Sequence, residues 1–186
     1  MILEFGWDRL TPCSPNPENM NIQQFKIALV EGDIDFLSKI DRFDVRQTDD
    51  HGNNILHYFA KNRNSISTDC VSLVRQLLQL GLDINQIEQK PPHRSALHLA
   101  VQGRHKDLVT VLIDCGIDID SKDENGNSAL WQAVMSYNGD DSFFIKYLLK
   151  NGANPDLENN HGVSPLSLSE TIANYDSRLY FSNDET

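Results

Sequence analysis

Three stretches of this 186-residue chain repeat one seven-residue pattern. The pattern reads NILHYFA at 54–60, SALHLAV at 95–101 and SALWQAV at 128–134, and a weaker copy, SPLSLSE, follows at 164–170. The third position is always leucine, at Leu56, Leu97, Leu130 and Leu166, with spacings of 41, 33 and 36 residues. Such periods predict stacked copies of one supersecondary unit, because a single unit of this size cannot bury its apolar face alone.

A glycine follows each of the first three leucines at a nearly regular distance. Gly81, Gly116 and Gly152 lie 25, 19 and 22 residues after the leucine, and the next leucine comes 16, 14 and 14 residues later. The variable lengths are therefore insertions into a unit of about 33 residues. Apolar residues of helical period predict one short helix at each leucine and a second that ends at each glycine, where a left-handed C-cap is expected.

These residues resemble the ankyrin repeat, whose signature is T-P-L-H-x-A with a 33-residue period. The stretch SALHLAVQGRHKDLVTVLIDCGIDIDSKDENG at 95–126 matches a whole unit, and the resemblance covers about residues 21–175. It implies an all-α ankyrin-repeat solenoid of stacked helix-turn-helix units with β-hairpin-like finger loops.

The same alignment divides the chain into four parts. Residues 1–20 form an N-terminal arm, which is either a disordered leader or, as its large apolar side chains favour, docked on the stack. We expect a degenerate capping repeat at 21–48, three repeats at 49–158 with insertions at about 61–70 and 138–141, and a C-terminal capping half-repeat with an acidic tail at 159–186.

The sequence contains none of the catalytic and metal-binding motifs that we searched for. It has no G-x-S-x-G, H-E-x-x-H or P-loop motif. His57 and His98 fall on the histidine of the signature and His105 on its G-H turn, so the resemblance implies structural roles for all three. The three cysteines, Cys13, Cys70 and Cys115, suggest free thiols in a reducing compartment. We therefore expect no catalytic residue, no metal and no cofactor.

The net charge of −11 is unevenly distributed along the sequence. Residues 1–106 hold 13 acids and 12 bases, whereas residues 107–186 hold 14 acids and 4 bases, giving −1 and −10. This acidity argues against binding nucleic acid, and it indicates either a partner protein with a basic surface or plain solubility. No apolar run approaches the length of a membrane helix and no secretory signal is evident. We therefore expect a cytoplasmic chain that does not bind a membrane. We also expect the chain to be monomeric on its own.

The resemblance implies a non-enzymatic protein-binding module whose finger tips and first helices contact the partner. The positions that the repeat pattern leaves free are the candidate partner-binding residues: Asp50, His51, Asn53, Lys61, Asn62, Gln89, Pro91, Pro92, Arg94, Gln102, Lys122, Glu124, Asn125, Asn127, Met135, Ser136, Glu158, Asn160 and His161. We expect the module to sequester or inhibit its partner, in one version as an immunity protein that neutralises a toxin. The alternatives are a scaffold or adaptor without inhibitory role, or an enzyme that uses the inserted loops.

Overall fold

Helices make up the regular structure of the chain in a computed structural model that describes residues 21–33, 38–66, 68–171 and 176–181. Eight are α-helices, namely α1 (Ile22–Glu31), α3 (Ile55–Asn62), α4 (Cys70–Gln79), α5 (Ala96–Gln102), α6 (Lys106–Asp114), α7 (Ala129–Met135), α8 (Phe143–Lys150) and α9 (Pro165–Thr171). Three are short 3-10 helices, η1 (Ile40–Arg42), η2 (Arg63–Ser65) and η3 (Ser177–Tyr180). Within these ranges there is no strand, only one isolated bridge between Ile87 and Ser95, so the predicted all-α solenoid is confirmed.

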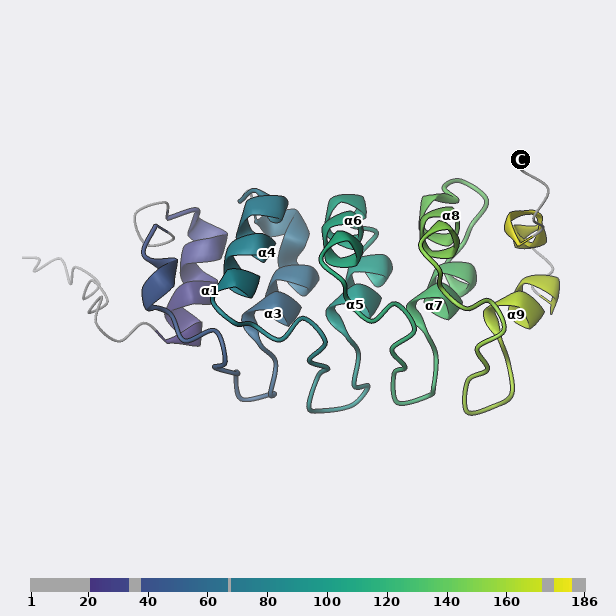
Figure 1. Ribbon diagram of the computed structural model, residues 1–186, viewed down its shortest axis with the longest axis horizontal. Helices are drawn as coiled ribbons and strands as arrows, with labels where there is room; N and C mark the ends of the chain where they lie inside the picture. The colour runs from purple at the N-terminus through teal and green to yellow at the C-terminus, as the bar shows by residue number, and fades with distance from the viewer. Residues whose placement is uncertain (1–20, 34–37, 67, 172–175, 182–186) are drawn as a thin grey trace, which may run out of the picture.

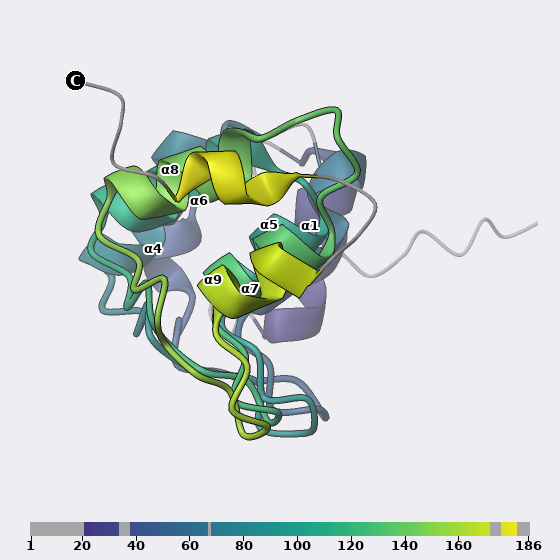
Figure 2. The same cartoon turned by 90° about the vertical axis from the view of Figure 1, so that its right-hand side faces the viewer.

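The helices form two layers along one axis (Figure 1). The first helices of successive units pack side by side, α1 on α3, α3 on α5, α5 on α7 and α7 on α9, and α4 packs on α6 in the second layer. Loops project from the stack at regular intervals, and seen along the axis they overlap at one corner of the molecule (Figure 2). The candidate partner-binding residues of the loops are therefore presented on one side.

The first helices begin at polar caps that the sequence places two residues before each leucine. The side chains of Asn54, Ser95 and Ser128 accept hydrogen bonds from the backbone N–H groups three residues later, as N-caps do. Ser164 accepts the same bond from Ser167 N at 3.1 Å. These caps explain why each helix starts at the same point of the repeat.

The glycine landmarks end the second helices. Gly81, Gly116 and Gly152 have φ values of 91°, 83° and 90°. This left-handed conformation is strained for residues with a Cβ atom, so glycine here sets the turn that leads the chain to the next finger.

The core runs through the whole stack as a row of equivalent side chains. Leu56, Leu97 and Leu130 are at most 1% exposed, whereas Leu166 is half-buried. Phe59 is fully buried in the slot that Ala100 holds one repeat later, so its ring fills the space between neighbouring helices.

The degenerate first unit is tied to the next one by an ion pair. In the regular unit the Nε2 of His98 lies 2.9 Å from the backbone oxygen of Asn127 in the following finger. Lys26 occupies the corresponding slot of α1, and its Nζ lies 2.6 Å from Oδ2 of Asp49. Both side chains are about one-tenth exposed, so a nearly buried salt bridge replaces the ring-to-backbone bond.

Among the described residues, the short helix η3 follows α9. This segment packs on α9. The hydroxyl of Tyr180 lies 3.0 Å from that of Tyr137, and Lys146 lies over the Tyr180 ring. Residues 1–20 and 182–186 lie outside the described ranges, so the docking of the N-terminal arm stays a prediction.

The inserted loops are held against the middle repeat by charge. Arg63, in the first loop, donates to Oδ2 of Asp107 from Nε at 3.1 Å and from Nη2 at 2.6 Å. Asp141, in the second loop, lies 2.8 Å from Nζ of Lys106. Both loops thus contact the turn and the start of α6 in the intervening unit.

Candidate partner-binding surface

Four finger loops form the surface that the sequence proposes for partner binding. We call them finger 1 (49–53), finger 2 (88–94), finger 3 (123–127) and finger 4 (159–163). Each lies just before a first helix, at α3, α5, α7 and α9. Side chains of the fingers and of the first helices can therefore reach the same partner.

Fingers 1, 3 and 4 are closed by one carboxylate or carboxamide. In finger 3, Oδ1 of Asp123 accepts hydrogen bonds from Asn125 N at 2.9 Å and Asn127 N at 2.8 Å. The backbone N–H of Asp123 also donates to Asn127 O at 2.9 Å. Asp49 and Asn159 make the same set of bonds in their fingers. An Asp or Asn that bonds the backbone two and four residues on fixes the turn without using the tip side chains.

The same bonds explain the charge state of Asp49. Burial raises its pKa, but the ammonium of Lys26 and the N–H groups of Asn53 and His51 outweigh this effect and lower the pKa to about 2. Asp49 is therefore ionised in the folded protein at neutral pH.

Finger 2 has a different construction, as its two prolines and missing glycine predict. Glu88 takes the closing role, since its N–H donates to Arg94 O and its Oε2 accepts from Arg94 Nε, both at 2.9 Å. Lys61 forms a second ion pair with the other oxygen of Glu88. Burial raises the pKa of Glu88, but the bonds from Arg94 and Lys61 outweigh this and lower it. His93, with φ of 56°, stands where the other fingers have a left-handed glycine.

Backbone hydrogen bonds join fingers 2, 3 and 4 to one another. Glu124 N donates to Pro92 O, and Asn160 N donates to Asn125 O, each at 2.9 Å. The Nδ2 of Asn160 also donates to Glu124 O at 2.9 Å. These bonds fix the spacing between neighbouring tips before any partner arrives.

Lysine side chains add one link between fingers 1 and 2 and another between the residues just before fingers 3 and 4. Lys90 Nζ donates to Asp50 O at 2.9 Å, and Lys122 Nζ donates to Glu158 O at 2.8 Å. The fingers approach so closely that a Cβ atom on Gly126 would lie 2.5 Å from Oδ1 of Asn160. Glycine is required at this position both for this contact and for its φ of 77°.

Fourteen of the nineteen candidate residues are exposed: Asp50, His51, Lys61, Gln89, Pro91, Gln102, Lys122, Glu124, Asn125, Met135, Ser136, Glu158, Asn160 and His161. Asn62, Pro92 and Arg94 are half-buried.

Asn53 and Asn127 do not face outward, and their expected exposure was wrong. Each is only 8% exposed. Asn127 Oδ1 accepts from Asn159 Nδ2 at 2.8 Å, so its carboxamide is used between fingers 3 and 4. Both positions follow the turn glycine, where the chain re-enters the stack.

Two exposed apolar residues of α1 were not among the candidate binding residues named from the sequence. Ile27 is 56% exposed and Val30 47% exposed. Alignment of Ala28 with Ala100 places Val30 in the slot of Gln102 and of Met135, which is 55% exposed. The repeat register alone was therefore enough to identify Val30 as such a position. The irregular sequence of the first unit concealed it.

The histidines in the signature positions are buried in the stack. Nδ1 of His57 lies 2.6 Å from Oδ1 of its cap, Asn54. Burial lowers the pKa of His57 to about 4 and also lowers the pKa values of His98 and His105. Among the residues that the structure describes, no three His, Cys, Asp or Glu side chains are placed to hold a metal ion.

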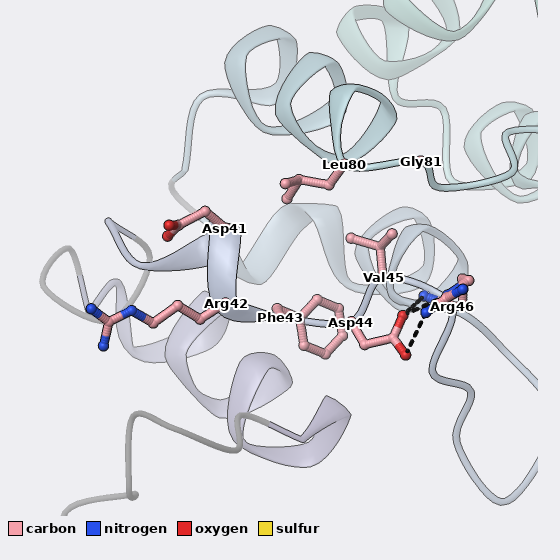
Figure 3. Close-up of a pocket in the computed structure, with 8 residues that line it drawn as sticks. All are labelled: Asp41, Arg42, Phe43, Asp44, Val45, Arg46, Leu80 and Gly81. Atoms are coloured by element: carbon pink, nitrogen blue, oxygen red, sulfur yellow. Dashed lines mark hydrogen bonds and ion pairs between the residues drawn. The ribbon is translucent and has the colours of Figure 1, made fainter.

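A shallow depression of about 480 Å³ lies away from the fingers, between the η1 region and the end of α4. Figure 3 shows its lining residues, among which the carboxylate of Asp44 accepts from Arg46 Nε at 2.9 Å. This pair is exposed, and its two members satisfy each other's charge. None of the described helices is long and apolar enough to span a bilayer.

Comparison with known proteins gives consistent matches. A family model described as ankyrin repeats, in three copies, matches residues 25–123 and 97–171. The chain is 33% identical over 146 residues to the transient receptor potential cation channel subfamily A member 1 of Homo sapiens, across 75% of this chain and 12% of that protein. It is 30% identical over 148 residues to the nuclear factor NF-kappa-B p105 subunit of Gallus gallus, across 76% and 14%. It is also 41% identical over 88 residues to neurogenic locus notch homolog protein 1 of Danio rerio, across 47% and 3%. The chain thus spans a small part of the length of each of these relatives.

Proposed function

The chain belongs to the ankyrin-repeat family, and on this premise we propose that it sequesters or inhibits a partner protein with a basic surface. Ankyrin repeats indicate a protein–protein interaction module, which is the part of the function that the family supplies. The partner would be held by the finger tips and by the exposed side chains of the first helices.

The observation that carries the proposal is the concentration of acidic charge on the last repeats. Residues 107–181 contain 12 acids and 4 bases, whereas residues 21–106 contain 10 acids and 11 bases. The exposed Glu124 and Glu158 lie in and beside fingers 3 and 4. A field of one sign over part of a surface steers an oppositely charged protein toward it and raises the association rate.

Capture of the partner from the host extract, followed by mass spectrometry, identifies the protein to be tested. Association and dissociation rates of the purified pair are then measured at increasing salt. We expect association to slow more than dissociation accelerates, because exposed charges are screened beyond about 8 Å at physiological ionic strength. An acidic partner, or binding without salt dependence, would contradict the proposal.

The activity of the captured partner separates inhibition from scaffolding. An inhibitor, including an immunity protein that neutralises a toxin, abolishes the activity when added in stoichiometric amounts. A scaffold or adaptor leaves it unchanged while bringing a third protein into the complex. Co-expression with a toxin encoded by a neighbouring gene tests the immunity version, since protection of the cells would support it.

We propose further that the chain is not an enzyme and acts as a monomer in the cytoplasm. The enzyme alternative assigned the reaction to the inserted loops. Arg63 and Asp141, the charged residues of these loops that contact the middle repeat, are both in ion pairs with it. This use of their charges supports a structural role for the loops.

A further inference from the structure

A small cavity opens on the partner-binding side between α3 and α5. Its volume is about 330 Å³, and its lining residues are Ala60, Lys61, Arg94, Leu99, Gln102 and Gly103. Ala60 is fully buried and Leu99 is 4% exposed, so they form an apolar floor. The walls carry two cations and one carboxamide, and none of the six lining residues is acidic.

The two cations of this cavity share a single carboxylate. Lys61 pairs with one oxygen of Glu88, and Arg94 Nε lies 2.9 Å from the other. The Glu88 side chain is only 5% exposed, whereas those of Lys61 and Arg94 are 37% and 23% exposed. The carboxylate therefore lies behind the cations, and one positive charge at the cavity is not balanced by this acid.

Arg94 and Lys61 also have more N–H donors at the cavity than these bonds use. Arg94 uses Nε for Glu88 and Nη1 for the Oε1 of Gln102, and Nη2 makes no hydrogen bond with any residue in the described ranges. A lysine ammonium has three N–H groups and an arginine guanidinium five. A second carboxylate can thus accept bonds from Arg94 and Lys61 without displacing Glu88.

We propose that this cavity receives an acidic side chain of the partner, a glutamate or an aspartate. The inference rests on the proposed function, since it assigns part of the same binding surface. Charge-assisted bonds from a guanidinium and an ammonium suit a carboxylate, and the apolar floor suits the methylene groups that carry it. The cavity supplies a specific contact within a surface whose acidic rim attracts a basic partner.

A second contact lies one repeat further along the stack. Met135 occupies on α7 the slot that Gln102 occupies on α5, and it is 55% exposed. Neighbouring packed helices are about 8–10 Å apart, and the cavity lies between α3 and α5, so Met135 on α7 is about one and a half spacings, roughly 12–15 Å, from it. An extended chain covers this distance in about four residues. The occupant is therefore a segment of the partner that presents a large apolar residue about four positions from its acidic residue.

A random peptide library tests this specification without a known partner. Phage-displayed peptides of about 12 residues, which span roughly 40 Å when extended, are selected on the full chain. We expect enriched sequences to combine one Asp or Glu with an apolar residue at the stated spacing. Replacing that acid by its amide in a synthetic peptide should weaken binding about tenfold, measured by fluorescence anisotropy. The proposal would be overturned if the enriched sequences lack an acidic residue, or if no sequence is enriched.

A matched pair of variants locates the contact. Gln102→Glu places a carboxylate beside Arg94 and should weaken binding of the acidic peptide about tenfold. Gln76→Glu makes the same charge change at an exposed position of α4 and should leave it within about twofold. Circular dichroism checks that both are folded. Equal effects would overturn the cavity assignment. A captured protein partner that binds Gln102→Glu normally would also overturn it, while leaving the proposed function intact.

Discussion

Buried histidines make the stability of the stack depend on pH at the level of single residues. The ring of His57 is 1% exposed and lies against its cap, Asn54. Its pKa in the folded chain is about 4, because burial disfavours the charged ring. His98 and His105 are shifted in the same direction for the same main reason.

The free energy of unfolding should therefore fall as the pH is lowered. Unfolded His57 takes up its proton near pH 6.5 and folded His57 only near pH 4, so between these values the unfolded state binds more protons. The full shift corresponds to roughly 3 kcal/mol, lost as the pH falls from 6.5 to about 4. Urea unfolding at several pH values measures the slope, and His57→Gln should reduce it. An unchanged slope in that variant would show that another group is responsible.

Two positions of α5 should differ sharply in their contribution to stability. Leu97 is fully buried in the best-formed unit, and truncation of such a leucine to alanine costs about 2–5 kcal/mol. Gln102 is exposed, and substitutions at exposed positions usually change stability by about 0.5 kcal/mol or less. Urea unfolding of Leu97→Ala and Gln102→Ala provides the comparison. Similar midpoints would mean that the assigned repeat register is wrong.

At the scale of the element, each finger depends on one closing side chain more than on its tip. Asp123 accepts two backbone N–H groups, and Asn159 does the same in finger 4 with a neutral carboxamide. In both fingers the acceptor is an Oδ1 atom, so a negative charge on the closing side chain is not needed to form the turn. The closing residue and the tip residues can therefore be tested separately.

Asp123→Ala should destabilise the chain by about 1–3 kcal/mol, because it leaves backbone N–H groups of finger 3 without their acceptor. Asp123→Asn should be close to neutral, since it keeps the Oδ1 acceptor that Asn159 uses. Thermal unfolding of the two variants gives the difference. If Asn is as damaging as Ala, the charge and not the geometry closes the finger.

The sequence predicted the elements better than the contacts between them. The leucine and glycine positions predicted the helix pairs, because these features follow from local backbone requirements. The closing role of Glu88 was not foreseen, since two extra residues in finger 2 displace it from the aligned position. The ion pair between Lys26 and Asp49 was also not predicted, because Lys26 stands where the regular unit has a histidine. A salt bridge there replaces the hydrogen bond from the ring to the backbone.

At the scale of the whole molecule, the asymmetry of charge should govern how fast a basic partner arrives. Asp123 is unsuitable for a charge-reversal test of this steering, because it closes its turn. The Glu124 side chain is exposed in the same finger, and the finger's bonds to its neighbours use the backbone N–H and oxygen of this residue.

Glu124→Lys should slow association with the captured basic partner severalfold at low salt and much less at high salt. Asp114→Lys, at the exposed end of α6, makes the same change of charge away from the fingers and should have a smaller effect. Stopped-flow measurements of both variants at two salt concentrations separate the rates. Equal slowing by the two variants would mean that net charge alone, without its location, sets the rate.

The bonds between fingers have a consequence for how this molecule can change over evolutionary time. Glu124 N to Pro92 O and Asn160 N to Asn125 O join main-chain atoms, which any residue except proline can supply at the donor position. Mutation of the tip side chains at Glu124 and Asn125 therefore leaves these two links in place. Successive generations could exchange such residues, and with them the partner that is recognised, while the inherited framework stays the same.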